Sequence, residues 1–490
     1  MQKFTILFLL PLLIIFSCQN EKPSKELTDP KTEIKYIEEN LLPAIIVKGK
    51  PTENFSMAER MEYHKVPGVS IAVLKDGKIR WTKSYGFANT NTGTKVNENT
   101  LFQAGSISKP LAALAALKLA EEGKIDLGAD VNTYLTGWKI PDSKFLEEED
   151  VTITRLLTHT AGMTVHGFPG YTQTDTFPDI ETVLKGEGNT PAIFVDTFPG
   201  AMWRYSGGGY TVMEKVVEDV SGMPLEAYMA QNILKPMGLE NSTYEQPLPE
   251  PLHANASAAY DNLGNIIEGL WHNYPEQAAA GLWTTPTDLA KYFLEIQGIY
   301  TGEKEGILSQ EMVKTMLTKH ENGWGLGPGM QKEGDSLMFG HGGKNAGFTN
   351  NMMAFANHGA GVVVMTNADN GGRLIAEIIR AVSAYYDWNI TKPRVVETIE
   401  LDEEKISKLT GTYIFEEQVD GIGDYLVDAK IEDGQLVVVD PNNNETDYFT
   451  PLEPMKFINL NNGNEVVFEE TEDDGMKFVW NGRFHFTRVK

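Results

Sequence analysis

Ser106 and Lys109 form the first pair of residues whose types and spacing could do chemistry, within "QAGSISKPLAAL", residues 103–114. Pro110 is acceptable in a helix only in the first turn, so the apolar run that follows predicts a buried helix beginning at this pair. Side chains three residues apart lie on one face of a helix. A serine hydroxyl becomes a nucleophile when a base takes its proton, and a desolvated lysine could help as that base. The alternative is a helix cap beside a solvated lysine.

Two further segments could complete such a site. "WRYSGGGYTVMEKVVEDVSG", residues 203–222, places Tyr205 before a glycine run and an amphipathic helix. A tyrosine has a reference pKa of about 10, so it needs a neighbour such as an ammonium group to act as a base. "FGHGGKNAGF", residues 339–348, ends a strand with His341 and two glycines, which allow a substrate backbone to approach closely. Either segment alone is more often a turn or a packed aromatic.

The elements around these residues predict an α/β (α+β) fold, with one antiparallel sheet covered by helices. Residues 69–86 read as two strands joined at Asp76-Gly77, a pair that accepts positive φ. Strand patterns return in residues 336–367, after a mainly helical stretch from about 100 to 320, and residues 373–388 predict a closing helix. Because strands from both ends flank a helical middle, we expect one sheet with a mainly helical subdomain.

In this order, the three segments resemble the motifs of the serine β-lactamase and penicillin-binding-protein superfamily: S-x-x-K, then Y-x-N, then K-T-G or H-x-G. The resemblance is strongest to the class C-like branch, with its family VIII-type esterases and D-aminopeptidase-like proteins. Connecting segments such as "TLFQAGSISKPLAALAALKLAEEGKIDL" and "VTITRLLTHTAGM" also look like family segments. The resemblance covers roughly residues 35 to 390 and implies a β-lactamase/transpeptidase-like domain.

The resemblance implies a role for each catalytic residue. Ser106 would be the acylated nucleophile, and Lys109 its electrostatic and proton-transfer partner. Tyr205 would be the general base for attack and the acid for the leaving group, and His341 would line the site and orient Tyr205 or the substrate. The backbone N–H groups of Ser106 and Lys344 would form the oxyanion hole, in which each donor is worth about 10²–10³ in rate.

Two positions depart from the family pattern. The asparagine of Y-x-N is Gly207 here, and the lysine of K-T-G is His341, which can be neutral at pH 7. Both departures weaken the case for efficient penicillin hydrolysis and favour an ester, small amide or peptide substrate. Trp283 and Trp324 are among the residues expected to line the substrate cleft, although packing in the core is at least an equal alternative for both. The residues expected to line the substrate cleft are Gly207, Gly342, Gly343, Asn345, Trp283 and Trp324.

Other catalytic motifs are weaker candidates. His159, in "LLTHTAGM", suggests a serine–histidine triad, but a hydrogen-bonded structural histidine in a loop is the better interpretation. The sequence has no G-x-S-x-G elbow and no H-E-x-x-H motif. We therefore expect neither a metal nor an organic cofactor.

The composition and the amino terminus bear on partners and location. The chain has 490 residues and a net charge of −26, which argues against nucleic-acid binding. Lys3 precedes a short apolar run, from Phe4 to Phe16, that is typical of an export signal. Cys18 is the only cysteine and lies where bacterial lipoproteins carry a lipidated cysteine, although Phe16 is bulky for that motif. We expect an exported protein of the cell envelope, attached to the membrane by a lipid anchor only. A secretion signal with an incidental cysteine is the alternative.

These patterns predict five segments. They are a signal peptide (1–18), a flexible tether (19–34), the hydrolase domain (35–390), a linker (391–400) and a C-terminal β-barrel-like domain (401–490). The last is predicted from short alternating segments separated by turn pairs, which are Asp433-Gly434, Asn462-Gly463, Asp474-Gly475 and Asn481-Gly482.

The predicted function is that of a serine hydrolase that forms an acyl-enzyme on Ser106 and acts on a small-molecule or peptide substrate. A D,D-peptidase or β-lactamase acting on cell-wall peptides or β-lactams is the alternative among enzymes. A slow-deacylating sensor or a binding lipoprotein is the alternative outside them. The sequence leaves the oligomeric state open.

Overall fold

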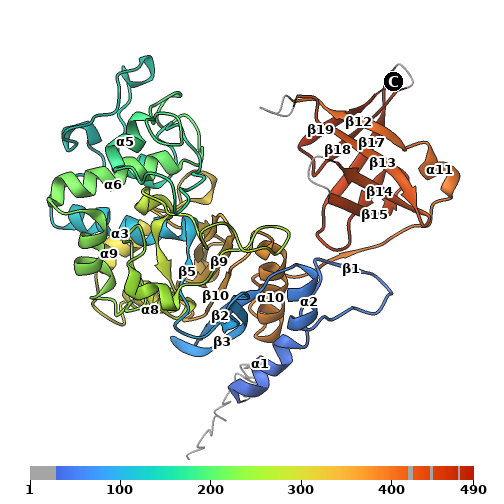
Figure 1. Ribbon diagram of the computed structural model, residues 1–490, viewed down its shortest axis with the longest axis horizontal. Helices are drawn as coiled ribbons and strands as arrows, with labels where there is room; N and C mark the ends of the chain where they lie inside the picture. Colours follow the sequence, from blue (N-terminus) through green and yellow to red (C-terminus); the bar gives the residue numbers. More distant parts are fainter. Residues whose placement is uncertain (1–28, 418–422, 442–444, 473–474, 490) are drawn as a thin grey trace, which may run out of the picture.

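A computed structural model describes residues 29–489 apart from 418–422, 442–444 and 473–474. It shows a mixed α/β unit built on a seven-stranded sheet, followed by a closed β-barrel (Figure 1). The predicted signal peptide, Cys18 and the tether up to residue 28 lie outside the described residues. Within the described part of the chain, no helix is both long enough and apolar enough to cross a bilayer.

The central sheet is antiparallel, with the strand order β4-β3-β2-β10-β9-β8-β7. The first hairpin turns at Asp76-Gly77, both at positive φ, and places β2 beside β10 in the middle of the sheet. The later meander supplies β8, β9 and β10, so the predicted single sheet from the two ends of the domain is confirmed. The strands are β2 (Gly68–Lys75), β3 (Lys78–Asn89), β4 (Thr94–Lys95), β7 (Gly329–Gln331), β8 (Met338–Asn345), β9 (Phe348–Phe355) and β10 (Gly361–Thr366).

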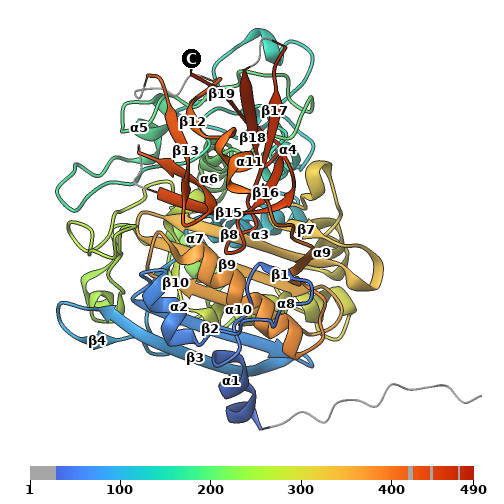
Figure 2. The ribbon, with the colours of Figure 1, turned by 90° about the vertical axis from the view of Figure 1, so that its right-hand side faces the viewer.

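Helices cover both faces of the sheet (Figures 1 and 2). On one face, α10 packs against β9 and β10 through Leu374, Ile378 and Val382, which recur every fourth residue and are fully buried. On the other face lie α8 and α3, and α3 is buried nearly all round, as its apolar sequence predicts. The helices are α1 (Pro30–Glu38), α2 (Met57–Tyr63), α3 (Ser108–Glu121), α4 (Ile153–Leu157), α5 (Ile180–Lys185), α6 (Gly207–Ser221), α7 (Leu225–Met229), α8 (Pro286–Thr301), α9 (Gln310–Met316) and α10 (Gly371–Tyr385).

The C-terminal strands close into a barrel, which confirms the predicted small β-domain. Its core is made of inward aromatic and aliphatic side chains, and helix α11 (Glu403–Ser407) adds Ile406 to it. The pairs Asp433-Gly434, Asn462-Gly463 and Asn481-Gly482 lie between paired strands as predicted, whereas Asp474 lies outside the described residues. The strands are β12 (Gly411–Phe415), β13 (Leu426–Glu432), β14 (Gln435–Asp440), β15 (Glu445–Glu453), β16 (Lys456–Ile458), β17 (Glu465–Glu470), β18 (Met476–Trp480) and β19 (Phe484–Arg488).

Helix α1 begins inside the range predicted as a flexible tether. Asp29 accepts a hydrogen bond from the backbone of Lys31, and Pro30 occupies the first turn, so residues 30–34 are helical. Asp29 and Pro30 are signals for the start of a helix, but the segment was predicted to be flexible because its composition is polar.

A second difference concerns two strands of three residues each. Residues 45–47, for which no strand was predicted, form β1 (Ile45–Val47) and pair in parallel with β11 (Arg394–Val396), which lies in the predicted linker. Ile458 of the barrel packs on this pair, and Arg394 bonds to Glu465 of the barrel at 2.6 Å. Three residues of the predicted linker, 394–396, therefore form a strand that joins the barrel to the segment around β1.

Candidate active site

Ser106 lies at the head of helix α3. Strand β5 (Phe102–Gln103) pairs with β6 (Trp283–Thr284) and leads into the 3-10 turn η1 (Gly105–Ile107). Gly105 has φ +57°, a left-handed conformation that suits glycine and sets the turn. The neighbouring Ser108 is occupied, because its hydroxyl donates to Gly105 O at 2.6 Å and accepts from Leu282 N at 3.0 Å. Ser106 is thus the serine left available at the helix start.

Lys109 is buried beside this serine. Its Nζ donates to Ser106 Oγ at 3.1 Å and to the carbonyl of Ala279 at 2.8 Å, and 2% of its surface is exposed. The carbonyl comes from a π-helical turn, η6 (Gln277–Gly281). No carboxylate among the described residues pairs with Lys109, and burial lowers its pKa to about 7. At neutral pH a substantial fraction of Lys109 is therefore an uncharged amine that can take the proton of Ser106.

Tyr205 faces the same pair just before helix α6. Lys109 Nζ lies 5.0 Å from the centre of the Tyr205 ring. Burial raises the pKa of Tyr205, and the nearby Ser106 side chain lowers it by a smaller amount. No hydrogen bond of ordinary geometry reaches its buried hydroxyl from the described residues. Tyr205 is therefore a neutral phenol that can pass a proton between Ser106 and a substrate.

The ring of His159 packs against the ring of Tyr205. The two rings pack with their centroids 4.2 Å apart and their planes tilted by 34°, and Ser206 N donates to His159 Nδ1 at 3.1 Å. Burial, with smaller effects from Lys109 and His341, lowers the pKa of His159 well below its ordinary value. The geometry gives His159 a positioning role through Tyr205, with its Nδ1 already used by the backbone.

His341 lines the site from strand β8. Its Nδ1 lies 2.5 Å from the carbonyl of Gly342, which can only accept, so Nδ1 carries the proton and Nε2 is the bare acceptor. Burial and the nearby Lys109 lower the pKa of His341 to about 4. At pH 7 His341 is therefore neutral and does not supply the positive charge of the K-T-G lysine.

Strand β8 approaches η1 closely where the oxyanion hole is expected. A Cβ on Gly105 would lie 2.5 Å from Lys344 N, and one on Gly343 would lie 1.9 Å from Ala104 O. This contact brings the backbone of Lys344 beside the turn that carries Ser106. The Lys344 side chain points outward, 64% exposed, with Nζ 3.7 Å from Asp369.

Of the other residues expected to line the cleft, Trp324 and Gly342 lie at the site, whereas Gly207 is covered by a neighbouring ring. Trp324 packs edge-on against Tyr205 and His341 at the site, and Gly342 is exposed on β8. Gly207 begins helix α6, and a Cβ there would lie 2.7 Å from the ring of Phe168. Phe168 therefore fills the space into which the Y-x-N side chain would extend.

Two of the residues expected to line the cleft make other contacts, and for Trp283 the alternative of core packing holds. Trp283 is fully buried between Trp271 and Phe348, so it belongs to the core. Asn345 donates from Nδ2 to Gln103 Oε1 and to the Ala280 carbonyl, both at 3.0 Å. Its amide fastens β8 to neighbouring segments, which leaves those hydrogens unavailable to a substrate.

Three features of the site were missed by the sequence analysis. Trp203 packs against Trp324 and His159, and the indole N–H groups of both tryptophans are buried without a partner among the described residues. The "WRY" spacing was a signal for Trp203, because alternate residues of an extended segment share a face. The Ala279 carbonyl gave no signal, since every residue carries a carbonyl. Phe168 gave none either. Among the described residues, no three His, Cys, Asp or Glu side chains are grouped to hold a metal ion.

Residues 56–385 match the family model described as Beta-lactamase. The chain belongs to the Beta-lactamase family. The order of Ser106, Lys109, Tyr205 and His341 along the chain follows the motifs that suggested this family. Membership supports a serine hydrolase or peptidase.

Curated relatives of this Beta-lactamase family member carry related names. This chain is 33% identical over 184 residues to "Putative penicillin-binding protein PbpX" of Bacillus subtilis, and the match covers 36% of this chain and 42% of that protein. It is 29% identical over 231 residues to "Putative D-alanyl-D-alanine carboxypeptidase" of Salmonella schwarzengrund, covering 44% and 52%. The chain thus spans about half or less of the length of these relatives.

Solved structures share the fold over most of the chain. The octameric penicillin-binding protein homologue from Pyrococcus abyssi superposes with a TM-score of 0.60 at 23% identity, covering 88% of this chain and 98% of that one. SurE gives a TM-score of 0.54 at 21% identity, with 88% and 97% coverage. These likenesses establish the architecture of the Beta-lactamase family member.

Proposed function

We propose that this protein is a serine hydrolase that forms an acyl-enzyme on Ser106 and cleaves an ester, small amide or peptide bond. The observation that carries the proposal is the buried Lys109 ammonium or amine, 3.1 Å from Ser106 Oγ and without a carboxylate partner. Retaining a buried lysine in this state costs stability, and an activated serine gives it a use.

In the first half-reaction, Ser106 Oγ attacks the carbonyl carbon and its proton passes to neutral Lys109, with Tyr205 in the relay. The N–H groups of Ser106 and Lys344 would hold the oxyanion of the tetrahedral intermediate. When the intermediate collapses, the bond to the leaving group breaks and that group takes the proton back through Tyr205. Water then attacks the acyl-serine in the same way and regenerates Ser106.

The walls of the site favour a substrate that does not depend on a carboxylate. His341 is neutral at pH 7 and offers a bare nitrogen acceptor, while Trp203 and Trp324 offer neutral indole donors. Such groups can bind amide or ester dipoles beside an apolar substituent. The D,D-peptidase alternative rests on the name of the Salmonella relatives and needs binding of a terminal carboxylate.

The test follows the intact mass of the protein after mixing with an activated acetate ester, a penicillin or a D-Ala-D-Ala peptide. We expect a transient adduct with the ester that Ser106→Ala abolishes, and little adduct with penicillin. Wild-type turnover by Ser106→Ala would overturn the proposal. A rapid penicillin adduct or peptide cleavage would replace the substrate assignment with the cell-wall alternative, and a persistent adduct would indicate a sensor.

We also propose that the protein is exported and held on the membrane through a lipid on Cys18. The charged start, the short apolar run and the cysteine at its end support this proposal. Metabolic labelling with a palmitate analogue tests it. We expect label in the wild type and none in Cys18→Ser, and equal membrane association of both proteins would contradict the anchor.

A further inference from the structure

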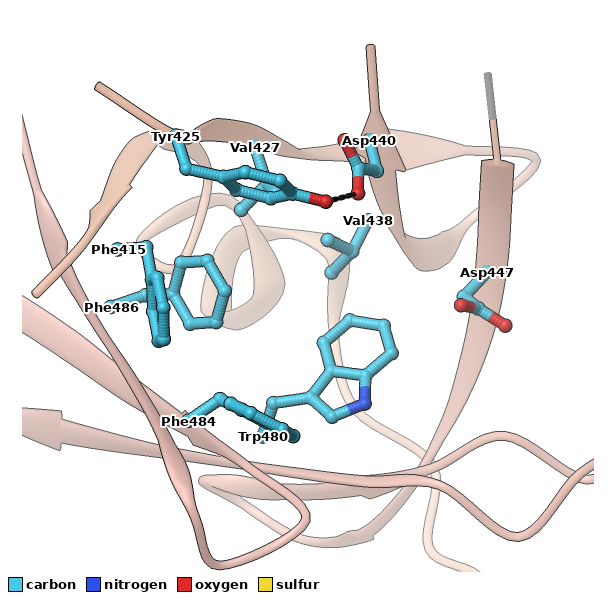
Figure 3. A pocket seen from close by; sticks show the side chains of 9 residues that line it. All are labelled: Phe415, Tyr425, Val427, Val438, Asp440, Asp447, Trp480, Phe484 and Phe486. Carbon is cyan, nitrogen blue, oxygen red and sulfur yellow. Dashed lines mark hydrogen bonds between the residues drawn. The ribbon is translucent and has the colours of Figure 1, made fainter. Parts of the chain in front are cut away.

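The C-terminal barrel contains a cavity that the proposed hydrolase reaction does not use. Its volume is about 270 Å³, near the lower limit of ordinary ligand pockets (Figure 3). Phe484, in the turn end of β19, is 38% exposed, so the cavity reaches the surface there. The cavity is lined by Phe415, Tyr425, Val427, Val438, Asp440, Asp447, Trp480, Phe484 and Phe486.

Aromatic rings form one side of this cavity and two carboxylates lie on another. Figure 3 shows Phe415 and Phe486 across from Asp440 and Asp447. The strand register explains the acidic side. Asp447 is paired with Val438, and Asp440 follows two residues later, so both aspartates share the inward face.

The hydrogen bonds hold the two carboxylates in place. The hydroxyl of Tyr425 donates to Asp440 Oδ2. The side-chain amides of Asn459 and Asn462 donate to Asp447, at 2.5 and 3.2 Å, and both bonds end on Oδ1. Among the described residues, no hydrogen bond is directed at Asp447 Oδ2, which leaves one oxygen of a fixed carboxylate for a ligand.

The charges at the cavity favour a cation. None of the nine lining residues is a lysine or an arginine. Burial raises the pKa of Asp447, and Arg373 of helix α10 opposes that effect without lining the cavity. Carboxylates at an aromatic wall are stabilised by a ligand that carries positive charge, because the charge pairs with the acid and is attracted to ring faces.

We propose that the barrel cavity binds a small organic ammonium ion with an aromatic or aliphatic body. The ammonium group donates to Asp447 Oδ2 and lies near Asp440, while the body lies against Trp480, Phe486 and Phe415. The walls are already formed, so binding orders little of the protein. This site is separate from Ser106 and does not depend on the hydrolase reaction.

Titration calorimetry of the full chain with three probes of similar shape tests the ligand class. The probes are 2-phenylethylammonium, neutral 2-phenylethanol and anionic 3-phenylpropanoate. We expect the ammonium probe to bind once per chain, at least tenfold tighter than the alcohol, and the anion not to bind. Equal affinity for the amine and the alcohol, or no binding of the amine at millimolar concentration, would overturn the proposal.

Matched variants locate the site. Asp447→Asn should weaken the ammonium probe about tenfold to a hundredfold, because a charged partner of the hydrogen bond is lost. Asp428→Asn removes the same charge from the exposed outer face of β13 and should leave affinity unchanged. If Asp447→Asn loosens the fold, Phe484→Ala provides a second variant at a partly exposed rim position, with an expected loss of about threefold to tenfold. Affinity that is equal in all variants would place the probe elsewhere and overturn the proposal, whereas Ser106→Ala should bind as the wild type does.

Discussion

Gly343 and Ala104 touch so closely that a Cβ on Gly343 would lie 1.9 Å from the Ala104 carbonyl oxygen. This contact joins strand β8 to the segment that carries Ser106. Lys344 N, the expected second oxyanion donor, can therefore lie this close to the Ser106 segment only because residue 343 is a glycine. The neighbouring Gly342 is different, because the nearest atom to its Cβ would lie 3.7 Å away.

The two glycines form a matched pair for mutation. Gly343→Ala should push β8 away from η1 and reduce kcat at least 10²-fold, the usual effect of losing an oxyanion donor. Gly342→Ala should retain the wild-type melting temperature, because ordinary contact distances remain. Ester turnover and thermal unfolding of both variants test this. Similar activity in Gly343→Ala and the wild type would mean that the contact does not set the donor position.

Lys344→Ala should be nearly silent. The donor expected at this position is the backbone N–H, and the side chain is 64% exposed with Nζ no closer than 3.7 Å to Asp369. We expect kcat/KM for the ester to change by less than about threefold, since exposed ion pairs contribute little. A loss as large as that of Gly343→Ala would show that the ammonium group itself acts on the substrate.

Lys109→Met should abolish acylation and yet make the fold more stable. The variant removes the proposed proton acceptor of Ser106, so the acyl adduct should fall below detection by intact mass. Replacing a buried ionisable group by an apolar one of similar length should stabilise the fold by about 1–3 kcal/mol at pH 7. Urea unfolding measures this difference, and a destabilised variant would contradict the desolvation argument.

The pH dependence of Lys109 follows from its depressed pKa. Folded Lys109 titrates near pH 7 and an unfolded lysine near 10.5, so the unfolded chain binds more protons between these values. The contribution of Lys109 to stability therefore improves as pH rises from about 7 to 10.5, and Lys109→Met should lack this trend. The acylation rate should rise through pH 7 as the amine loses its proton. A rate that falls with pH across this range would exclude the neutral amine as the base.

Tyr205→Phe separates proton transfer from packing. The ring contacts with His159 and Trp324 remain, while the hydroxyl beside Ser106 is lost. We expect kcat to fall about 10²–10⁴-fold, the range for a positioned acid–base group, with little change in the melting temperature. A kcat within threefold of the wild type would remove Tyr205 from the proton relay.

The sequence singled out the candidate reacting groups because their types and spacing are chemical requirements. The spacing of Ser106 and Lys109 at a proline-marked helix start, and the position of His341 at the glycine-rich end of a strand, are local features. The structure brings these residues together with Tyr205 around one site. What supports them is not local. Phe168 beside Gly207, and the Ala279 carbonyl on Lys109, come from segments with no chemical signature.

The fold shows the same division. The Asp76-Gly77 hairpin and the periodic face of α10 were predicted because each pattern extends over several turns or residues. β1 and β11 were not, because three residues cannot show a period, and each strand is stabilised only by its distant partner. Trp283 was left open between cleft and core for a related reason, since an aromatic residue near a site and one in the core look alike in sequence.

The protonation of His341 gives a final prediction, on acid stability. Its folded pKa is about 4 and an unfolded histidine titrates near 6.5, so the unfolded chain binds more protons between these values. Stability should therefore fall as pH is lowered from 6.5 to 4, by about 3 kcal/mol from this residue at about 1.4 kcal/mol per pH unit. His341→Gln cannot take up a proton and should lose that part of the dependence. His358→Gln, which changes an exposed histidine, should keep it. Urea unfolding at pH 7 and pH 4.5 compares the three proteins. Equal acid sensitivity of His341→Gln and the wild type would mean that burial does not depress the pKa of His341, and the argument for a fully neutral His341 would lose this support.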